Sequence, residues 1–146
     1  MNQIPIPVSV KRVLLRKIDG TAEVLLLRNE RNEWELPGGR PEANETPEAC
    51  LCREILEETG FVVEVGSCIH DGVLTILPPH TPRATDVLIS AYVCDVKSPA
   101  DTHVSIALSN EHKAAAWIRV EDLAAMSDVP GIYKAAVLGW KREIGL

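Results

Sequence analysis

The segment from residue 38 to residue 61, GGRPEANETPEACLCREILEETGF, constrains the fold of this chain more than any other. It predicts a helix that begins after Thr46, a good N-cap residue, with Pro47 at the first helical position. Gly60 suits the residue that ends a helix in a left-handed conformation. The helix follows a glycine pair, and glycines let other groups approach the backbone closely.

One face of the predicted helix is acidic. Glu54, Glu57 and Glu58 share that face because they are spaced i, i+3 and i+4, and Arg53 lies beside them. Such clustering costs roughly 0.2–0.5 kcal/mol per like-charged pair in an isolated helix. A divalent cation would offset this cost, since Mg²⁺ and Mn²⁺ select carboxylate oxygens. A solvated acidic face is the alternative.

The opposite side of the helix carries smaller and apolar residues. Ala49, Cys52 and Leu56 lie away from Glu54 when the helix is drawn as a wheel. These three residues are therefore expected to form the buried stripe of the helix.

The spacing of the whole segment favours the cation. Gly39 is followed after five residues by Glu45, and after seven more by REILEETGF at 53–61. This pattern resembles the Nudix box, G-x5-E-x7-R-E-U-x-E-E-x-G-U with U apolar, at every position. The flanking WELPGG and NEHKAAAWI match more loosely. The chain is therefore identified as resembling the Nudix hydrolase family, of the MutT-like kind.

The resemblance implies an α/β fold, an α/β/α sandwich with a central mixed β-sheet, in which the box forms a loop-helix-loop. A single domain over 1–146 is expected. The residue pattern agrees, since β-branched and apolar runs alternate with helical periodicity. Strands are predicted at 7–16, 22–28, 61–69, 72–77, 86–96 and 114–120. Further helices are predicted at 120–126 and 130–144, and 29–39 is expected to be a loop.

The resemblance also implies a metal site. Glu57 and Glu58 would be the principal Mg²⁺ ligands, with Mn²⁺ as a substitute. Glu54 would be a further ligand or would orient the attacking water, and the Gly38 carbonyl would complete the protein part of the shell. Arg53 would hold a box carboxylate in place, and the structural positions of the box would be Gly39, Glu45 and Gly60.

Residues outside the box each have two alternative roles. The general base is either a box glutamate or a glutamate on a distant loop, for which Glu111 is the candidate; a surface loop glutamate is the alternative. Arg28 ends a strand and either reaches a phosphate or base or is a strand-end charge. Arg83, in the proline-rich loop 78–85, is a candidate phosphate contact, although that loop would equally serve as a linker.

Function follows from the resemblance. Cleavage of (d)NTPs to the monophosphate and pyrophosphate is ranked first, hydrolysis of ADP-ribose or another nucleoside diphosphate sugar second. A non-catalytic nucleotide-binding regulator is the third hypothesis, which the complete set of box carboxylates disfavours. Homodimers are common in the family, so a homodimer is compatible with the resemblance.

Composition limits the partners and the compartment. The net charge of −6 argues against a surface that coats nucleic acid. No apolar run approaches the roughly 20 residues that span a bilayer, and no membrane partner is expected. The N-terminus lacks the pattern of a signal peptide. The four cysteines, which lack metal-site spacing, suit a reducing cytoplasm: Cys50, Cys52, Cys68 and Cys94.

Overall fold

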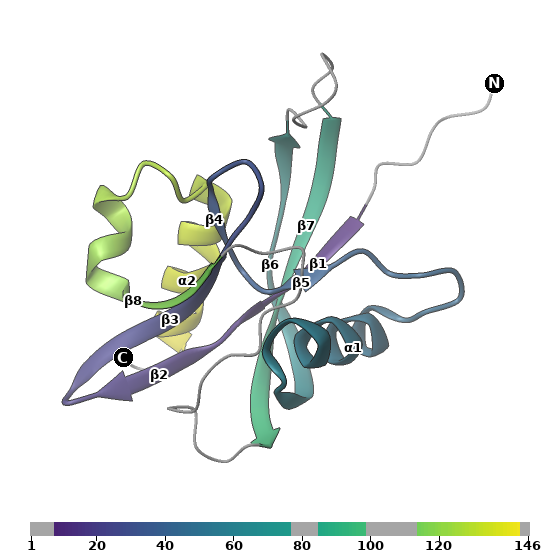
Figure 1. The fold of residues 1–146 in the computed structure, drawn as a ribbon, viewed down its shortest axis with the longest axis horizontal. Coiled ribbons are helices and arrows are strands. Elements are labelled where there is room, and N and C mark those ends of the chain that lie inside the picture. Colours follow the sequence, from purple (N-terminus) through teal and green to yellow (C-terminus); the bar gives the residue numbers. More distant parts are fainter. Residues whose placement is uncertain (1–7, 77–84, 99–113, 144–146) are drawn as a thin grey trace.

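The computed structural model describes residues 8–76, 85–98 and 114–143 (Figure 1). The elements are β1 Val8–Val13, β2 Leu15–Ile18, β3 Thr21–Arg28, β4 Trp34–Glu35, β5 Gly38–Gly39, α1 Pro47–Thr59, β6 Val62–Ile76, β7 Thr85–Ser98, β8 Ala114–Arg119, the 3-10 helix η1 Val120–Ala125 and α2 Gly131–Glu143.

The strands form two sheets of four. The first has the order β5-β1-β7-β6, in which β1 and β7 run parallel and the other pairs antiparallel. In the second, β3 pairs antiparallel with β2, β4 and β8. The α/β class and the mixed sheet predicted from the sequence are confirmed, with the mixed sheet accompanied by a separate antiparallel one.

The predicted strand at 7–16 is in fact two strands that belong to different sheets. The break falls at Leu14, whose carbonyl accepts a hydrogen bond from the Leu25 N–H at 3.1 Å. Leu14 itself packs into the core beneath α1. The strand before Leu14, β1, therefore pairs with β7, and the strand after it, β2, pairs with β3. A continuous apolar run in the sequence does not reveal this change of partner.

Three further predictions are corrected. The two strands predicted at 61–69 and 72–77 are replaced by one long strand, β6, over Val62–Ile76, whose irregularities are register shifts and not a turn. The expected loop at 29–39 contains β4 and β5. The helix expected at 120–126 is a 3-10 helix.

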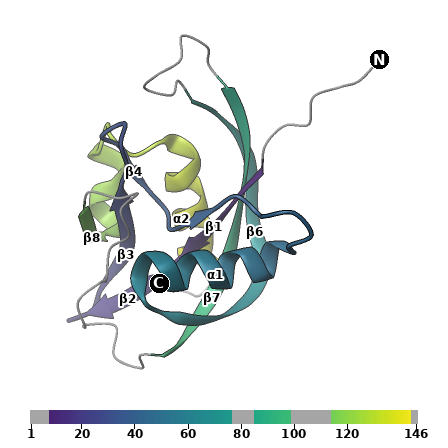
Figure 2. The same cartoon turned by 45° about the vertical axis from the view of Figure 1, so that its right-hand side comes forward.

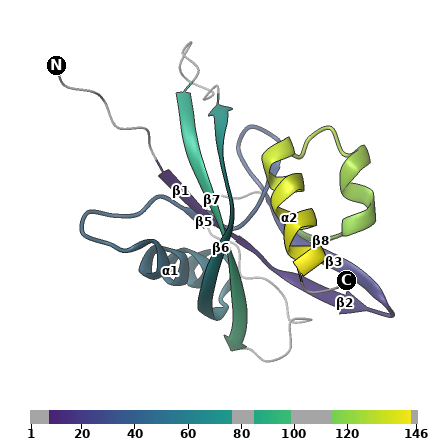
Figure 3. The same ribbon diagram turned by 180° about the vertical axis from the view of Figure 1, so that it is seen from behind.

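Two hydrophobic cores lie on opposite faces of the strands. Leu25 packs with Leu51 and Ile55 of α1, whereas its neighbours Val24 and Leu26 pack with α2. This division follows from the alternation of side chains along a strand. Figures 1 and 3 place α1 and α2 on either side of the β6–β7 hairpin, and Figure 2 shows η1 and α2 together near β4 and β8.

Helix α1 begins and ends as its sequence predicts. The Thr46 side chain accepts a hydrogen bond from the Ala49 N–H at 3.1 Å, and Pro47 opens the helix. Gly60 takes a left-handed conformation with φ of 78°, and its N–H bonds to the Leu56 carbonyl at 2.9 Å. In the three described ranges, no helix has the length and apolar character needed to cross a membrane.

The buried face of α1 differs from the one predicted. Cys50, Leu51 and Ile55 are fully buried, while Leu56 is 51% exposed and Cys52 is also exposed. The helix is turned so that part of its acidic face points inward, and Glu58 is 1% exposed. The reason lies in the glycine pair opposite that face.

Candidate active site

The glycine pair forms a short strand, β5, that leaves room for other groups. Gly38 has φ of 148°, and a β-carbon there would overlap the backbone carbonyl oxygen of Val10. A β-carbon at Gly39 would fall 2.5–2.8 Å from the carboxylate of Glu54. Both glycines are therefore required by close packing, Gly38 against backbone and Gly39 against a side chain.

The three carboxylates of the helix face have different surroundings. Glu58 is buried, and its Oε1 accepts a hydrogen bond from the Gly38 N–H at 2.9 Å. The Glu54 side chain is 13% exposed and lies against Gly39. The Glu57 side chain is 56% exposed. Two carboxylates thus face the glycine strand, and the third lies at the solvent side.

Arg53 joins the loop before α1 to the acidic face. Its guanidinium donates to both carboxylate oxygens of Glu45, at 2.8 and 2.9 Å, and to Glu54 at 2.9 Å. It also approaches Glu57 at 3.4 Å. Hydrogen bonding from Arg53 lowers the pKa of Glu45 to about 2, and the same carboxylates raise the pKa of Arg53 above its ordinary value.

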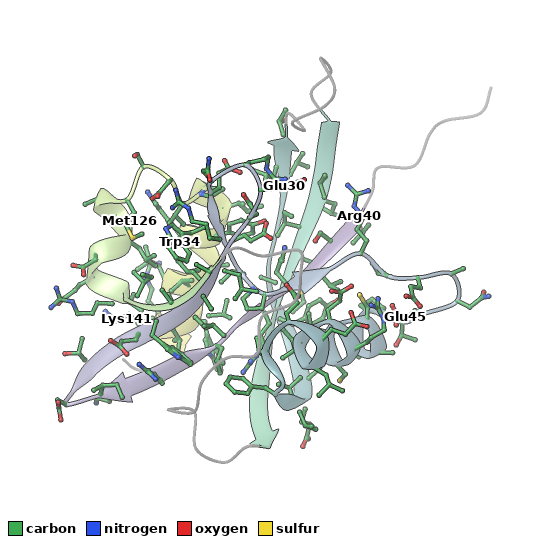
Figure 4. The ribbon with its side chains drawn as sticks, in the orientation of Figure 1. Glu30, Trp34, Arg40, Glu45, Met126 and Lys141 are labelled. Carbon is green, nitrogen blue, oxygen red and sulfur yellow. The ribbon has the colours of Figure 1, made fainter. Side chains whose placement is uncertain are left out.

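A cleft of about 520 Å³ opens at the glycine strand. Its box end is lined by Gly38, Gly39, Arg40 and Glu54. Figure 4 shows Arg40 in the segment after β5 and Glu45 beside α1. The acidic helix face, through Glu54, therefore opens onto a cavity of the size that small-molecule ligands occupy.

Beyond the box residues, the lining of the cleft combines cations with apolar residues. Lys11 and Arg31 line it, together with the side chains of Val87, Ile89 and Tyr133. These residues come from β1, the loop before β4, β7 and α2, so the two sheets and a helix meet here. An anionic ligand with an apolar or aromatic portion fits such a wall.

Lys11 is the charged residue that sequence reasoning missed. It is 5% exposed, and its Nζ lies 3.9 Å from Glu35 Oε2 and 5.9 Å from the centre of the Tyr133 ring. Burial lowers the pKa of Lys11, but Glu35 and other neighbours outweigh that effect and hold the pKa above its ordinary value. A signal was present in the sequence, namely two adjacent cations inside a predicted strand.

Of the substrate contacts predicted outside the box, Arg28 lies within the described residues. The Arg28 guanidinium donates to Asp128 at 2.7 Å and lies 5.3 Å from the Trp34 ring. Arg28 therefore ties β3 to the segment before α2 instead of lining the cleft. Glu111 and Arg83, with the loop 78–85, lie outside the described residues.

The donor set at the box suits a hard divalent cation. Glu54, Glu57 and Glu58 supply carboxylate oxygens, the ligand type that Mg²⁺ and Mn²⁺ prefer. Within the described ranges, no three His, Cys, Asp or Glu side chains are already gathered as a complete ligand group. The types of the box side chains fit the chemistry of such an ion, which Glu54, Glu57 and Glu58 would hold.

Comparison with known proteins places these features in a family. The NUDIX domain family model matches residues 8–136, which include β1, the box and the first part of α2. The chain belongs to the Nudix hydrolase family, whose members are generally divalent-metal dependent.

Individual relatives agree with this assignment. A MutT-like protein of Streptomyces ambofaciens is 32% identical over 117 residues, which are 80% of this chain and 66% of the relative. Putative nudix hydrolase 1 of Caenorhabditis elegans is 40% identical over 122 residues, 77% of this chain and 29% of that protein. The chain thus spans about two thirds or less of these relatives.

The fold is also found among solved structures. The MutT protein from Methanosarcina mazei Go1 superimposes with a TM-score of 0.72 at 24% identity, covering 100% of both chains. At this identity the likeness supports the shared fold.

Proposed function

We propose that the chain hydrolyses a nucleoside diphosphate linked to a further moiety, and that its substrates are (d)NTPs, cleaved to the monophosphate and pyrophosphate. The observation that carries this proposal is the cleft, in which Glu54 of the box and the cations Lys11 and Arg31 line one cavity. A protein of net charge −6 needs such local cations to receive an anionic substrate.

Each residue has a proposed task. Glu54, Glu57, Glu58 and the Gly38 carbonyl would hold Mg²⁺, which when bound neutralises phosphate charge and acidifies water. Arg53 keeps Glu54 oriented through their 2.9 Å hydrogen bond. In the reaction one water adds across a phosphoanhydride, its oxygen bonding to phosphorus as the bridging P–O bond breaks.

Two roles assigned from the sequence remain proposals without structural support. Glu111 is retained as the alternative to a box glutamate as general base, and Arg83 as a phosphate contact. For Arg28, the ion pair with Asp128 favours the structural alternative. We assign the phosphate contact expected of Arg28 to Lys11 and Arg31, which line the cleft.

A substrate panel tests the proposed function. The protein would be incubated with Mg²⁺ and each of the eight common (d)NTPs, ADP-ribose and UDP-glucose, and the products separated by ion-exchange chromatography. We expect monophosphate and pyrophosphate from at least one triphosphate, and no product in EDTA. Faster cleavage of ADP-ribose or UDP-glucose would favour the diphosphate-sugar alternative. If no compound is cleaved with Mg²⁺ or Mn²⁺, the binding-only regulator is favoured instead.

A further inference from the structure

The lining of the cleft includes a carboxylate shared by two cations. Glu35, on β4, lies 3.9 Å from the Lys11 ammonium and 3.6 Å from the Arg31 guanidinium. All three residues line the cleft. Lys11 comes from β1 and Arg31 from the loop before β4, so Glu35 joins two separate parts of the chain.

The loop that carries Arg31 is built around a buried asparagine. Asn29, 5% exposed, accepts hydrogen bonds on its side-chain oxygen from the N–H groups of Arg31 and Glu33, at 2.9 and 3.1 Å. Its amide nitrogen donates to Glu35 at 3.1 Å. The side chain of Asn29 thus holds both the loop and the carboxylate of Glu35, and it fixes the backbone position of Arg31.

Both cations keep the capacity to bind a further oxygen. A guanidinium carries five N–H donors, so the contacts of Arg31 with Glu33 and Glu35 do not use up its capacity. An ammonium carries three donors, and the 3.9 Å distance from Lys11 to Glu35 is an ion pair longer than a hydrogen bond.

We propose that Glu35 is a positioning residue, which holds Lys11 and Arg31 as a pair of cations for the phosphate oxygens of the substrate; this rests on the proposed nucleotide hydrolysis. A buried ammonium and a long arginine are costly to place without an opposite charge nearby. Preplacing them removes the entropy cost of ordering them when the ligand binds. Lys11 pairs in register with Gly38 of the box, and both cations line the same cleft as Glu54, so a diphosphate bound there would contact the cations close to the carboxylates.

The test compares Glu35→Gln with three variants. Glu35→Asp keeps the charge, Lys11→Met removes one cation, and the double variant joins Lys11→Met to Glu35→Gln. The control Glu23→Gln removes a similarly buried carboxylate from an ion pair with Arg16, away from the cleft. Steady-state kinetics would use the best substrate of the panel, and calorimetry would measure the binding of inorganic pyrophosphate.

Glu35→Gln should raise KM and the pyrophosphate Kd roughly ten- to hundredfold, the loss expected for charged hydrogen bonds, with kcat changed less than about threefold. Glu35→Asp should recover part of that loss, and Glu23→Gln should behave as wild type. The double variant should bind pyrophosphate more weakly than Lys11→Met, but by less than the two single losses combined, because Glu35 acts through Lys11 and also through Arg31.

Several results would overturn the proposal. A pyrophosphate Kd for Glu35→Gln within about twofold of wild type would show that the cations need no positioning, and fully additive losses would show that Glu35 acts independently. If Glu35→Gln fails to fold, Arg31→Gln replaces it, and an unchanged Kd there defeats the proposal. If wild type cleaves no nucleotide, the proposed function fails, while pyrophosphate binding still tests this inference.

Discussion

The carboxylate of Glu54 lies against the α-carbon of Gly39, where a β-carbon would stand 2.5 Å from the Glu54 carboxyl carbon. Gly39→Ala should therefore push this carboxylate out of place. Because the end of a side chain can move, the stability loss should stay below about 1 kcal/mol, whereas kcat/KM should fall on the order of a hundredfold. Urea unfolding and steady-state kinetics measure the two effects. Wild-type kinetics in this variant would show that catalysis does not depend on where Glu54 lies.

At the neighbouring Gly38, substitution by alanine should instead cause a large loss of stability. A β-carbon at Gly38 would overlap the Val10 carbonyl, and φ of 148° is strained for any other residue. Gly38→Ala should therefore cost more than about 2 kcal/mol of unfolding free energy. Gly131→Ala, which places its β-carbon in open space at the start of α2, is the matched control and should be close to neutral. Equal stability of the two variants would contradict this account.

Glu57→Gln separates catalysis from stability. The side chain is 56% exposed and its contact with Arg53 is 3.4 Å, so the ion pair contributes little to folding. Repulsion from its neighbours falls at the same time. The thermal midpoint should stay nearly unchanged or rise slightly, while Mg²⁺-dependent turnover falls by orders of magnitude. Glu48→Gln, one of the acidic residues outside the motif, should keep its activity, and full activity in Glu57→Gln would remove Glu57 from the metal site.

The Glu45–Arg53 ion pair should make the stability of the folded protein depend on pH. Arg53 lowers the pKa of Glu45 from 4.5 to about 2 in the folded protein. The contribution of Glu45 to stability is therefore fully present above about pH 4.5 and is lost as pH falls toward 2. Glu45→Gln should unfold more easily than wild type at pH 7, and the difference should shrink below pH 4.5. Thermal melts from pH 7 to pH 3 measure it; a constant difference would argue against the ion pair.

The thiols should differ in reactivity. Burial raises the pKa of Cys50 to about 12, whereas Cys52 and Cys68 are exposed. Brief treatment with iodoacetamide at pH 8 should label Cys52 and Cys68 and leave Cys50 unmodified, as peptide mass spectrometry would show. Turnover should survive the treatment, because neither labelled residue lines the cleft. Rapid labelling of Cys50 would mean that α1 opens away from the sheet.

Local signals in the sequence located the box helix and its ends. Thr46 and Gly60 act through hydrogen bonds within a few residues of themselves, so their roles are readable without the fold. The orientation of the helix was not readable in the same way. A wheel diagram points apolar residues inward, but Glu58 turns inward because the Gly38 N–H is available to it.

The cleft was the harder part to predict. Its wall brings together Lys11, Glu35 and Tyr133, which are far apart in the sequence and meet through the pairing of strands and the packing of α2. None of these residues belongs to a motif of fixed spacing. Arg28 had the right residue type and a plausible place at a strand end, but Asp128, a hundred residues away, determines where it points.

The parallel pairing of β1 with β7 has a consequence for the order of synthesis. Val8 pairs with Leu88 and Val13 with Val93, so β1 gains this neighbour after the whole box has been translated. Contacts of such separation are closed late and slow folding. When the box helix has left the ribosome, the nascent chain therefore contains every glutamate of the motif. It still lacks Val87 and Ile89, which line the cleft in the folded protein. Until β7 emerges, the nascent chain exposes the edge of β1 that pairs with it and the side chains of Val13, Val24 and Leu26 that pack with Val87 and Ile89, which makes this interval the one in which chaperones would be needed.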